Sequence, residues 1–119
     1  MKIAISCSMQ YRDLIKDVMA QLTELRFYPL FPNLDYNPEK NELGNKKLAM
    51  DHYEAINESN IVYFITPNGY MGTSCKLELG YAVAKNKLIY FSEPTNDPAL
   101  DCYAVGFITT SSLKDFLFN

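Results

Sequence analysis

The residues best suited to chemistry lie around a glycine-containing loop at 66–73, which follows an apolar run and precedes a helical pattern. Gly69 and Gly72 allow this loop to bend and let a ligand approach its backbone. The following helix would present free N–H groups and the positive end of its dipole, which favour negative charge. The loop therefore predicts a ligand site, with Tyr70 available for stacking on a base and Ser74 at the helix start. An ordinary strand-to-helix turn is the alternative explanation of the two glycines.

Glu78 is the candidate nucleophile of this site. With Ser74 as the N-cap, Glu78 lies just past the first helical turn, where the dipole lowers the pKa of a carboxyl group. An ionised carboxylate in a cleft is suited to attack on, or stabilisation of, an electron-poor sugar carbon. The alternative is a glutamate that only stabilises the start of the helix.

His52, the only histidine, is the candidate acid or base, because imidazole exchanges protons near physiological pH. It lies in a predicted helix over 45–58 and is suited to donate a proton to a departing base. A surface or half-buried helix residue without a partner is the alternative. Its neighbour Asp51 fits this role less well, because adjacent helix positions face different directions.

A second group of polar residues follows the first predicted strand. Ser6, Ser8 and Arg12 are suited to binding a phosphate or a ribose. Alternatively, Ser8 caps the following helix and Arg12 is a solvated residue of its first turn. Cys7 and Cys75 flank the same region without an evident base partner, so we expect them to be small packing residues.

These residues must be positioned by an alternating series of strands and helices. Short apolar runs predict strands, and apolar residues at helical spacing predict helices. Strands that alternate with helices imply a parallel sheet with helices on both faces, and right-handed crossovers leave few topologies. The expected strands are 2–6, 27–31, 61–65, 88–92 and, more weakly, 105–108, and the expected helices are 10–26, 45–58, 74–86 and 112–117.

We therefore predict a single flavodoxin-like α/β domain over 1–119, a three-layer sandwich with a parallel sheet of four to five strands in the order 2-1-3-4-5. Ligands bind such sheets beyond the carboxyl ends of the strands at the switch point, here between strands 1 and 3. This topology brings the segment 6–12 and the loop 66–73 to one edge of the sheet. Pro29 places the second strand towards an edge, because proline cannot donate to a ladder.

The overall composition is that of an ordinary globular protein, with 48% hydrophobic and 21% charged residues. A net charge of −3 with scattered Lys and Arg argues against a nucleic-acid partner. No apolar run has the length of a membrane span, and the N-terminus lacks a signal-peptide pattern. The three cysteines, including Cys102, have neither metal-site spacing nor an even count. We expect a cytoplasmic protein with free thiols and no metal.

One segment resembles a known family. Residues 69–82, Gly-Tyr-Met-Gly-Thr-Ser-Cys-Lys-Leu-Glu-Leu-Gly-Tyr-Ala, followed by Lys-Leu-Ile-Tyr at 87–90, resemble the nucleoside 2-deoxyribosyltransferase-like family. The resemblance implies that Glu78 attacks the anomeric carbon of a nucleoside or nucleotide, that the protein is a homodimer, and that no cofactor is needed. A family Asp that serves as partner acid corresponds to His52 here, and a second one corresponds to Asn60.

Two functional hypotheses follow. The first is N-glycosidic bond cleavage or transfer on a (deoxy)nucleoside or nucleotide through Glu78. The second, favoured by the missing Asp residues, is a non-catalytic module that binds a nucleotide or nucleotide-sugar. A phosphoribohydrolase of the lysine-decarboxylase-like type ranks lower, because Lys76 stands where its Glu is expected. An FMN protein rests on fold alone.

Overall fold

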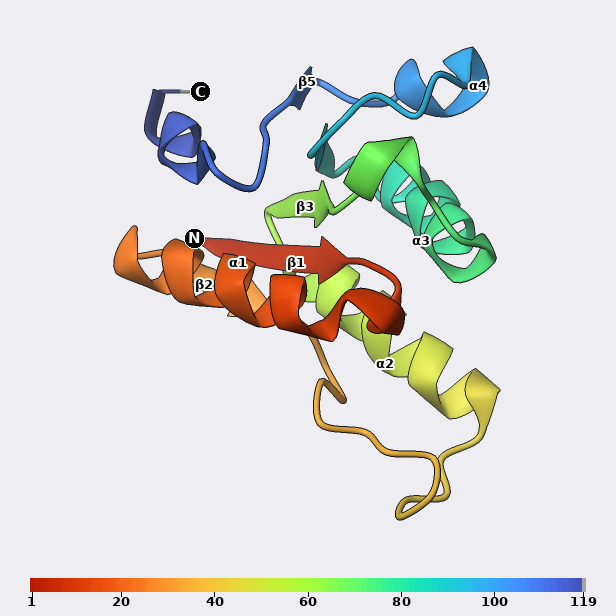
Figure 1. Ribbon diagram of the computed structural model, residues 1–119. Coiled ribbons are helices and arrows are strands. Elements are labelled where there is room, and N and C mark those ends of the chain that lie inside the picture. Colours follow the sequence, from red (N-terminus) through yellow and green to blue (C-terminus); the bar gives the residue numbers. More distant parts are fainter. Residues whose placement is uncertain (119) are drawn as a thin grey trace.

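Five parallel strands form one sheet in the order β2-β1-β3-β4-β5 (Figure 1), which confirms the predicted topology. The structure is a computed structural model that describes residues 1–118. The strands are β1 (Lys2–Ser6), β2 (Tyr28–Leu30), β3 (Ile61–Phe64), β4 (Leu88–Phe91) and β5 (Gly106–Phe107).

Helices cover both faces of this sheet, as the sequence predicts. Helix α1 and the C-terminal 3₁₀ segment η3 pack on one face, and α2 and α3 pack together on the other. The helices are α1 (Arg12–Glu24), α2 (Asn45–Glu58), α3 (Thr73–Ala84) and α4 (Pro98–Asp101), and the 3₁₀ segments are η1 (Met9–Tyr11), η2 (Pro67–Gly69) and η3 (Leu113–Phe118).

The central strands are buried on both sides, which explains their continuous apolar runs. Alternate residues of β1 and β3 enter opposite cores: Ile3 and Tyr63 face α1, whereas Ala4 and Val62 face α2 and α3. Residues 61–64 of β3 pair in register with Ile3–Ser6 of β1, so the carboxyl ends of the two strands meet at one edge.

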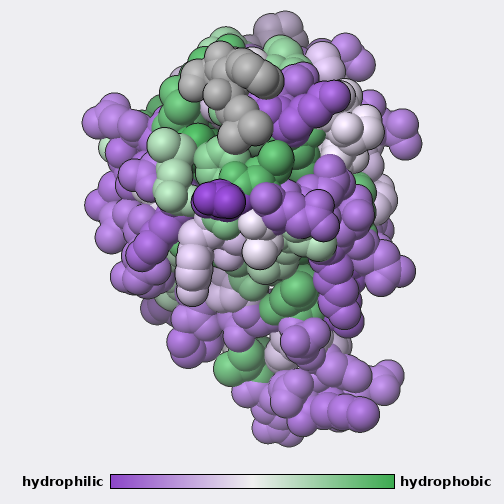
Figure 2. All heavy atoms as spheres, turned by 90° about the vertical axis from the view of Figure 1, so that its left-hand side faces the viewer, coloured by the Kyte–Doolittle hydropathy of each residue, from purple (hydrophilic) through white to green (hydrophobic). Residues whose placement is uncertain are grey.

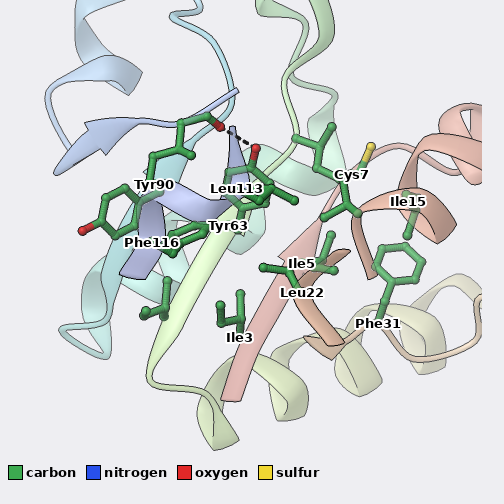
Figure 3. Close-up of a cluster of buried hydrophobic side chains, with 14 residues drawn as sticks. Ile3, Ile5, Cys7, Ile15, Leu22, Phe31, Tyr63, Tyr90, Leu113 and Phe116 are labelled. Carbon is green, nitrogen blue, oxygen red and sulfur yellow. Dashed lines mark hydrogen bonds between the residues drawn. The ribbon is translucent and has the colours of Figure 1, made fainter. Parts of the chain in front are cut away.

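The core beneath α1 holds a buried polar group (Figure 3). The hydroxyl of Tyr63 donates a hydrogen bond to the carbonyl oxygen of Ile108, just beyond β5. The ring of Phe116 packs edge-on against Tyr63 and Tyr90, with centroid distances of 5.4 and 5.1 Å. These contacts attach the last described segment of the chain to the central strand.

Two local features differ from the sequence prediction. The predicted loop 93–104 contains the short helix α4, which begins at Pro98 and is capped by the Asp97 carboxylate accepting from the Ala99 N–H at 3.0 Å. The predicted final helix forms as 3₁₀ structure instead. The expectation for Pro29 is confirmed, because β2 lies at an edge of the sheet.

The end of the molecule at the amino ends of the strands is hydrophilic around its rim, with hydrophobic residues towards the centre (Figure 2). Met1 and Leu88, which are 66% and 42% exposed, lie at the starts of β1 and β4.

No helix within residues 1–118 combines the length and apolarity that a membrane crossing requires. The candidate site lies at the opposite end of the strands.

Candidate functional site

A cavity of about 490 Å³ opens beyond the carboxyl ends of β1 and β3, at the predicted switch point. Three parts of the chain form it: the segment after β1, the β2–α2 loop with α2, and the loop that leads into α3. The residues of its wall include Ser8, Phe31, Asn33, His52, Tyr70 and Glu78.

Glu78 is a buried acid in the wall of this cavity, with only 8% of its surface exposed. The predicted N-cap Ser74 is wrong, because helix α3 begins at Thr73 after the N-cap Gly72. Glu78 is the sixth residue of the helix, past its first turn as predicted. Cys75 and Leu79 on the same helix pack against the sheet. This packing fixes the helix and leaves Glu78 directed at the cavity.

The environment of Glu78 raises its pKa from 4.5 to about 7. Burial is the main cause, because it removes the charged form from water. We expected the helix dipole to keep this carboxyl ionised, but the dipole fades beyond the first turn and desolvation outweighs it. At neutral pH the carboxyl is therefore close to half protonated.

Ser6, the last residue of β1, is buried near Glu78 and does not line the cavity. Its hydroxyl lowers the pKa of both Glu78 and Cys75. Within the described residues, however, its Oγ has no hydrogen-bond partner at good geometry, and it is buried. We therefore regard Ser6 as a nearby dipole, not as a firmly bonded donor to the carboxyl group.

His52 faces Glu78 across the cavity, with Nδ1 3.7 Å from Oε1. Burial lowers the pKa of the imidazole, although the charge of Asp51 and the backbone of Pro32 oppose this effect. Since burial disfavours charge on both groups, the carboxyl is partly protonated at neutral pH while the imidazole is neutral. The distance is also too long for a hydrogen bond. The two groups therefore face each other without a hydrogen bond and do not form a structural salt bridge.

Aromatic and hydroxyl groups form the remaining walls. Tyr70 and Tyr53 line the cavity. The ring of Tyr70 lies 6.3 Å from that of Tyr11, and Tyr53 stacks on Tyr81 at 4.9 Å, although Tyr11 and Tyr81 are outside the wall. Ser8, Thr73 and Ser74 contribute aliphatic hydroxyl groups to the wall, and the side chain of Ser8 makes no capping hydrogen bond to η1. The described wall contains no Lys or Arg. It can stack on a planar base and donate neutral hydrogen bonds.

The structure brings six of the predicted residues together in this wall: Ser8, His52, Tyr70, Gly72, Ser74 and Glu78. Arg12 and Gly69 do not line the cavity. The Arg12 guanidinium donates from Nη2 to the carbonyl of Tyr36 at 2.8 Å, and its buried Nε has no partner in the described part of the chain. Arg12 thus holds the β2–α2 loop.

Gly69 lies in the left-handed region at φ 81°, where a Cβ would stand 2.8 Å from the carbonyl oxygen of Pro94. It shapes the loop and does not line the cavity. Asn60 lies at the other end of the sheet, where its Oδ1 accepts from the Lys2 N–H at 3.0 Å. It therefore cannot replace a family Asp within this site.

The buried thiols also line the cavity but are poor nucleophiles. Burial raises the pKa of Cys7 to about 12 and that of Cys75 to about 11. A protonated thiol is weakly reactive, so their expected packing role stands. No group of three or more His, Cys, Asp or Glu within residues 1–118 is placed to hold a metal ion.

One wall of the cavity is not among the residues predicted from the sequence. Phe31, Asn33 and Tyr36 come from the β2–α2 loop, whose unusual length was its only signal. The wall residues of α2 are Asn45, Leu48, Ala49, His52 and Tyr53. Their helical spacing relative to His52 was a signal in the sequence that could have identified them.

Comparison with known proteins gives a likeness of fold. No protein-family model matches the chain, and no curated protein matches its sequence. The solved structure of the CMP N-glycosidase BcmB of Clostridium botulinum superposes with a TM-score of 0.66 at 16% identity. The match covers 99% of this chain and 98% of that chain. The two proteins therefore share one fold over their whole lengths.

Proposed function

We propose that the protein cleaves the N-glycosidic bond of a nucleoside or nucleotide, with Glu78 as nucleophile and His52 as its proton-transfer partner. The observation that carries this proposal is the buried Glu78 carboxyl in the wall of a 490 Å³ cavity, 3.7 Å from an imidazole. The resemblance of residues 69–90 to deoxyribosyltransferase-like enzymes supports it, as does the fold shared with a protein described as a CMP N-glycosidase.

The protonation states suggest how the pair works. At neutral pH the proton of the pair resides mainly on Glu78, because its pKa is about 7 and that of His52 is below 6.5. Transfer of this proton to His52 gives a carboxylate and an imidazolium. Such a coupled pair titrates as a unit, and the reactive arrangement is a minor form of its singly protonated state.

The reaction then proceeds in two displacements. A carboxylate oxygen of Glu78 forms a bond to C1′ while the bond from C1′ to the base nitrogen breaks. The electron pair leaves with the base, which takes the proton of His52. Water or a second base next attacks C1′ and gives a proton to the neutral His52, while the bond from C1′ to the Glu78 oxygen breaks, which completes hydrolysis or transfer. The rings of Tyr53 and Tyr70 in the cavity wall offer stacking surfaces for the departing base.

A second copy of the chain is part of the proposal. Leu77 lies beside Glu78 in the cavity wall and is nevertheless 61% exposed. Met50, on the neighbouring helix α2, is 53% exposed. A homodimer that covers the outer faces of α2 and α3 would remove this apolar surface from water.

The test is a panel of nucleosides and 5′-monophosphates, each incubated with and without an acceptor base and analysed by chromatography. We expect base release that falls by more than about a thousandfold in Glu78→Ala and Glu78→Gln. Glu54→Gln, which removes an exposed carboxyl from α2, should retain the full rate. Thermal stabilisation by these compounds without base release would refute the enzyme and favour a binding module.

A further inference from the structure

The loop after β2 contacts the imidazole of His52, which also lies beside Glu78. The Phe31 ring is 7% exposed and meets His52 edge-on, with ring centroids 4.8 Å apart at 77°. The backbone of Pro32 also interacts with the imidazole. His52 is thus placed between this loop and α3, and any movement of the loop would change its distance from Glu78.

One side chain ties this loop to α2. Asn33 follows Pro32 in the left-handed conformation at φ 61°, which Asn tolerates better than most residues. Its Nδ2 donates to Oδ2 of Asp51 at 3.0 Å, while Oδ1 of Asp51 accepts from Lys47. Asp51 immediately precedes His52, so loop and helix are joined at two adjacent positions.

We propose that Asn33 is a positioning residue, which holds the loop 31–33 on α2 and thereby fixes the imidazole of His52 against Glu78. The groups that face His52 are Asp51 from its own helix and Glu78 from α3, together with the Phe31 ring and the Pro32 backbone. The catalytic consequence rests on the proposed function. The positional consequence does not, because it is a property of the free protein.

The test uses His52 as a single NMR probe, since the chain has one histidine. Asn33→Gly removes the amide and keeps the left-handed conformation accessible. Asn86→Gly is the matched control, because Asn86 has φ 56° and lies just after α3. In Asn33→Gly we expect loss of the cross-peaks between His52 and Phe31. The pKa of His52 should rise towards 6.5, since its largest shift comes from burial.

Exchanging the donor and the acceptor of the Asn33–Asp51 hydrogen bond tests whether this bond positions His52 or whether the Asn33 variants only loosen the loop. Asn33→Asp places two carboxylates together and should disturb the His52 signals as Asn33→Gly does. Adding Asp51→Asn rebuilds the hydrogen bond in the opposite direction and should restore the cross-peaks. Wild-type His52 spectra in both Asn33→Gly and Asn33→Asp, or failure of the swap to restore them, would overturn the proposal.

Steady-state kinetics of the same variants can be measured with any nucleoside or 5′-monophosphate that the protein cleaves. We expect kcat to fall about tenfold to a hundredfold in Asn33→Gly with little change in KM, because a misplaced proton donor affects the chemical step. The swap should recover most of the rate. A protein that shows the NMR changes but turns over no nucleoside would refute the proposed function and leave the positioning role established. An active protein with unaltered NMR spectra would refute the positioning role alone.

Discussion

Replacing Glu78 by Gln should make the free energy of unfolding depend less on pH, because the buried Glu78 carboxyl must ionise as the pH rises. Its pKa is 4.5 when unfolded and about 7 when folded. A group whose pKa is raised by folding stabilises the native state below its unfolded pKa, and this contribution disappears as the pH passes its folded value. The wild type should therefore lose stability as the pH rises from about 4.5 to 7. Glu78→Gln lacks the carboxyl and should not show this loss.

The magnitude follows from the two pKa values. At about 1.4 kcal/mol for each tenfold change in proton affinity, the full titration of Glu78 amounts to about 3 kcal/mol. Between pH 5 and pH 8 the free energy of unfolding of Glu78→Gln should gain about 2–3 kcal/mol relative to the wild type. His52 is present in both proteins, and its opposite contribution largely cancels in this difference.

Urea denaturation at four pH values from 5 to 8 measures the difference directly. Glu54→Gln, which removes an exposed carboxyl, controls for the change in net charge. If the difference between Glu78→Gln and the wild type stayed within about 0.5 kcal/mol across this range, the carboxyl would not be desolvated. The burial of the Glu78 carboxyl in the cavity wall would then be wrong, whatever the enzyme assays show.

Base release should have a bell-shaped pH profile that falls above about pH 7, where the pair loses its proton, and again at acid pH, where both groups are protonated. His52→Gln should replace this profile by one that rises through the pKa of Glu78, which a retained bell would contradict. Gly69→Ala should cost about 1–3 kcal/mol in urea denaturation, because φ is 81° and its Cβ would clash; an unchanged midpoint would argue against this geometry. In sedimentation equilibrium, Leu77→Glu should be monomeric, because it places a charge in the proposed dimer interface. Leu88→Glu should remain dimeric, because the exposed Leu88 begins β4 at the end of the sheet opposite the cavity. A dimeric Leu77→Glu would place the interface elsewhere.

The fold could be predicted because its signals are local and repeated. The apolar runs of β1, β3 and β4 alternate with helical spacing, and parallel topology follows from this alternation. Pro29 marked an edge strand through its missing N–H. Helix α4 was hidden within a proline-containing loop, since its four residues are too few to show a period.

Only part of the candidate site could be predicted from the sequence, because some of its contacts join segments that are distant along the chain. Glu78 and its loop belong to one continuous segment, so position along the chain was enough to identify them. The partners of Arg12 and Asn33 depend on how the β2–α2 loop folds back, with Arg12 bonded to Tyr36 and Asn33 to Asp51. The pKa of Glu78 was likewise unpredictable, because it is set by burial that only the packed structure defines.

The hydrogen bond from Tyr63 to Ile108 affects how the chain opens. Strand β5 has two residues and would fray readily if only its ladder held it. The phenol joins it to the middle of the sheet, so opening the C-terminal segment leaves a buried hydroxyl unpaired. We therefore expect the amides of Val105 and Ile108, which bond to β4 carbonyls, to exchange with solvent in the same cooperative step as the central strands.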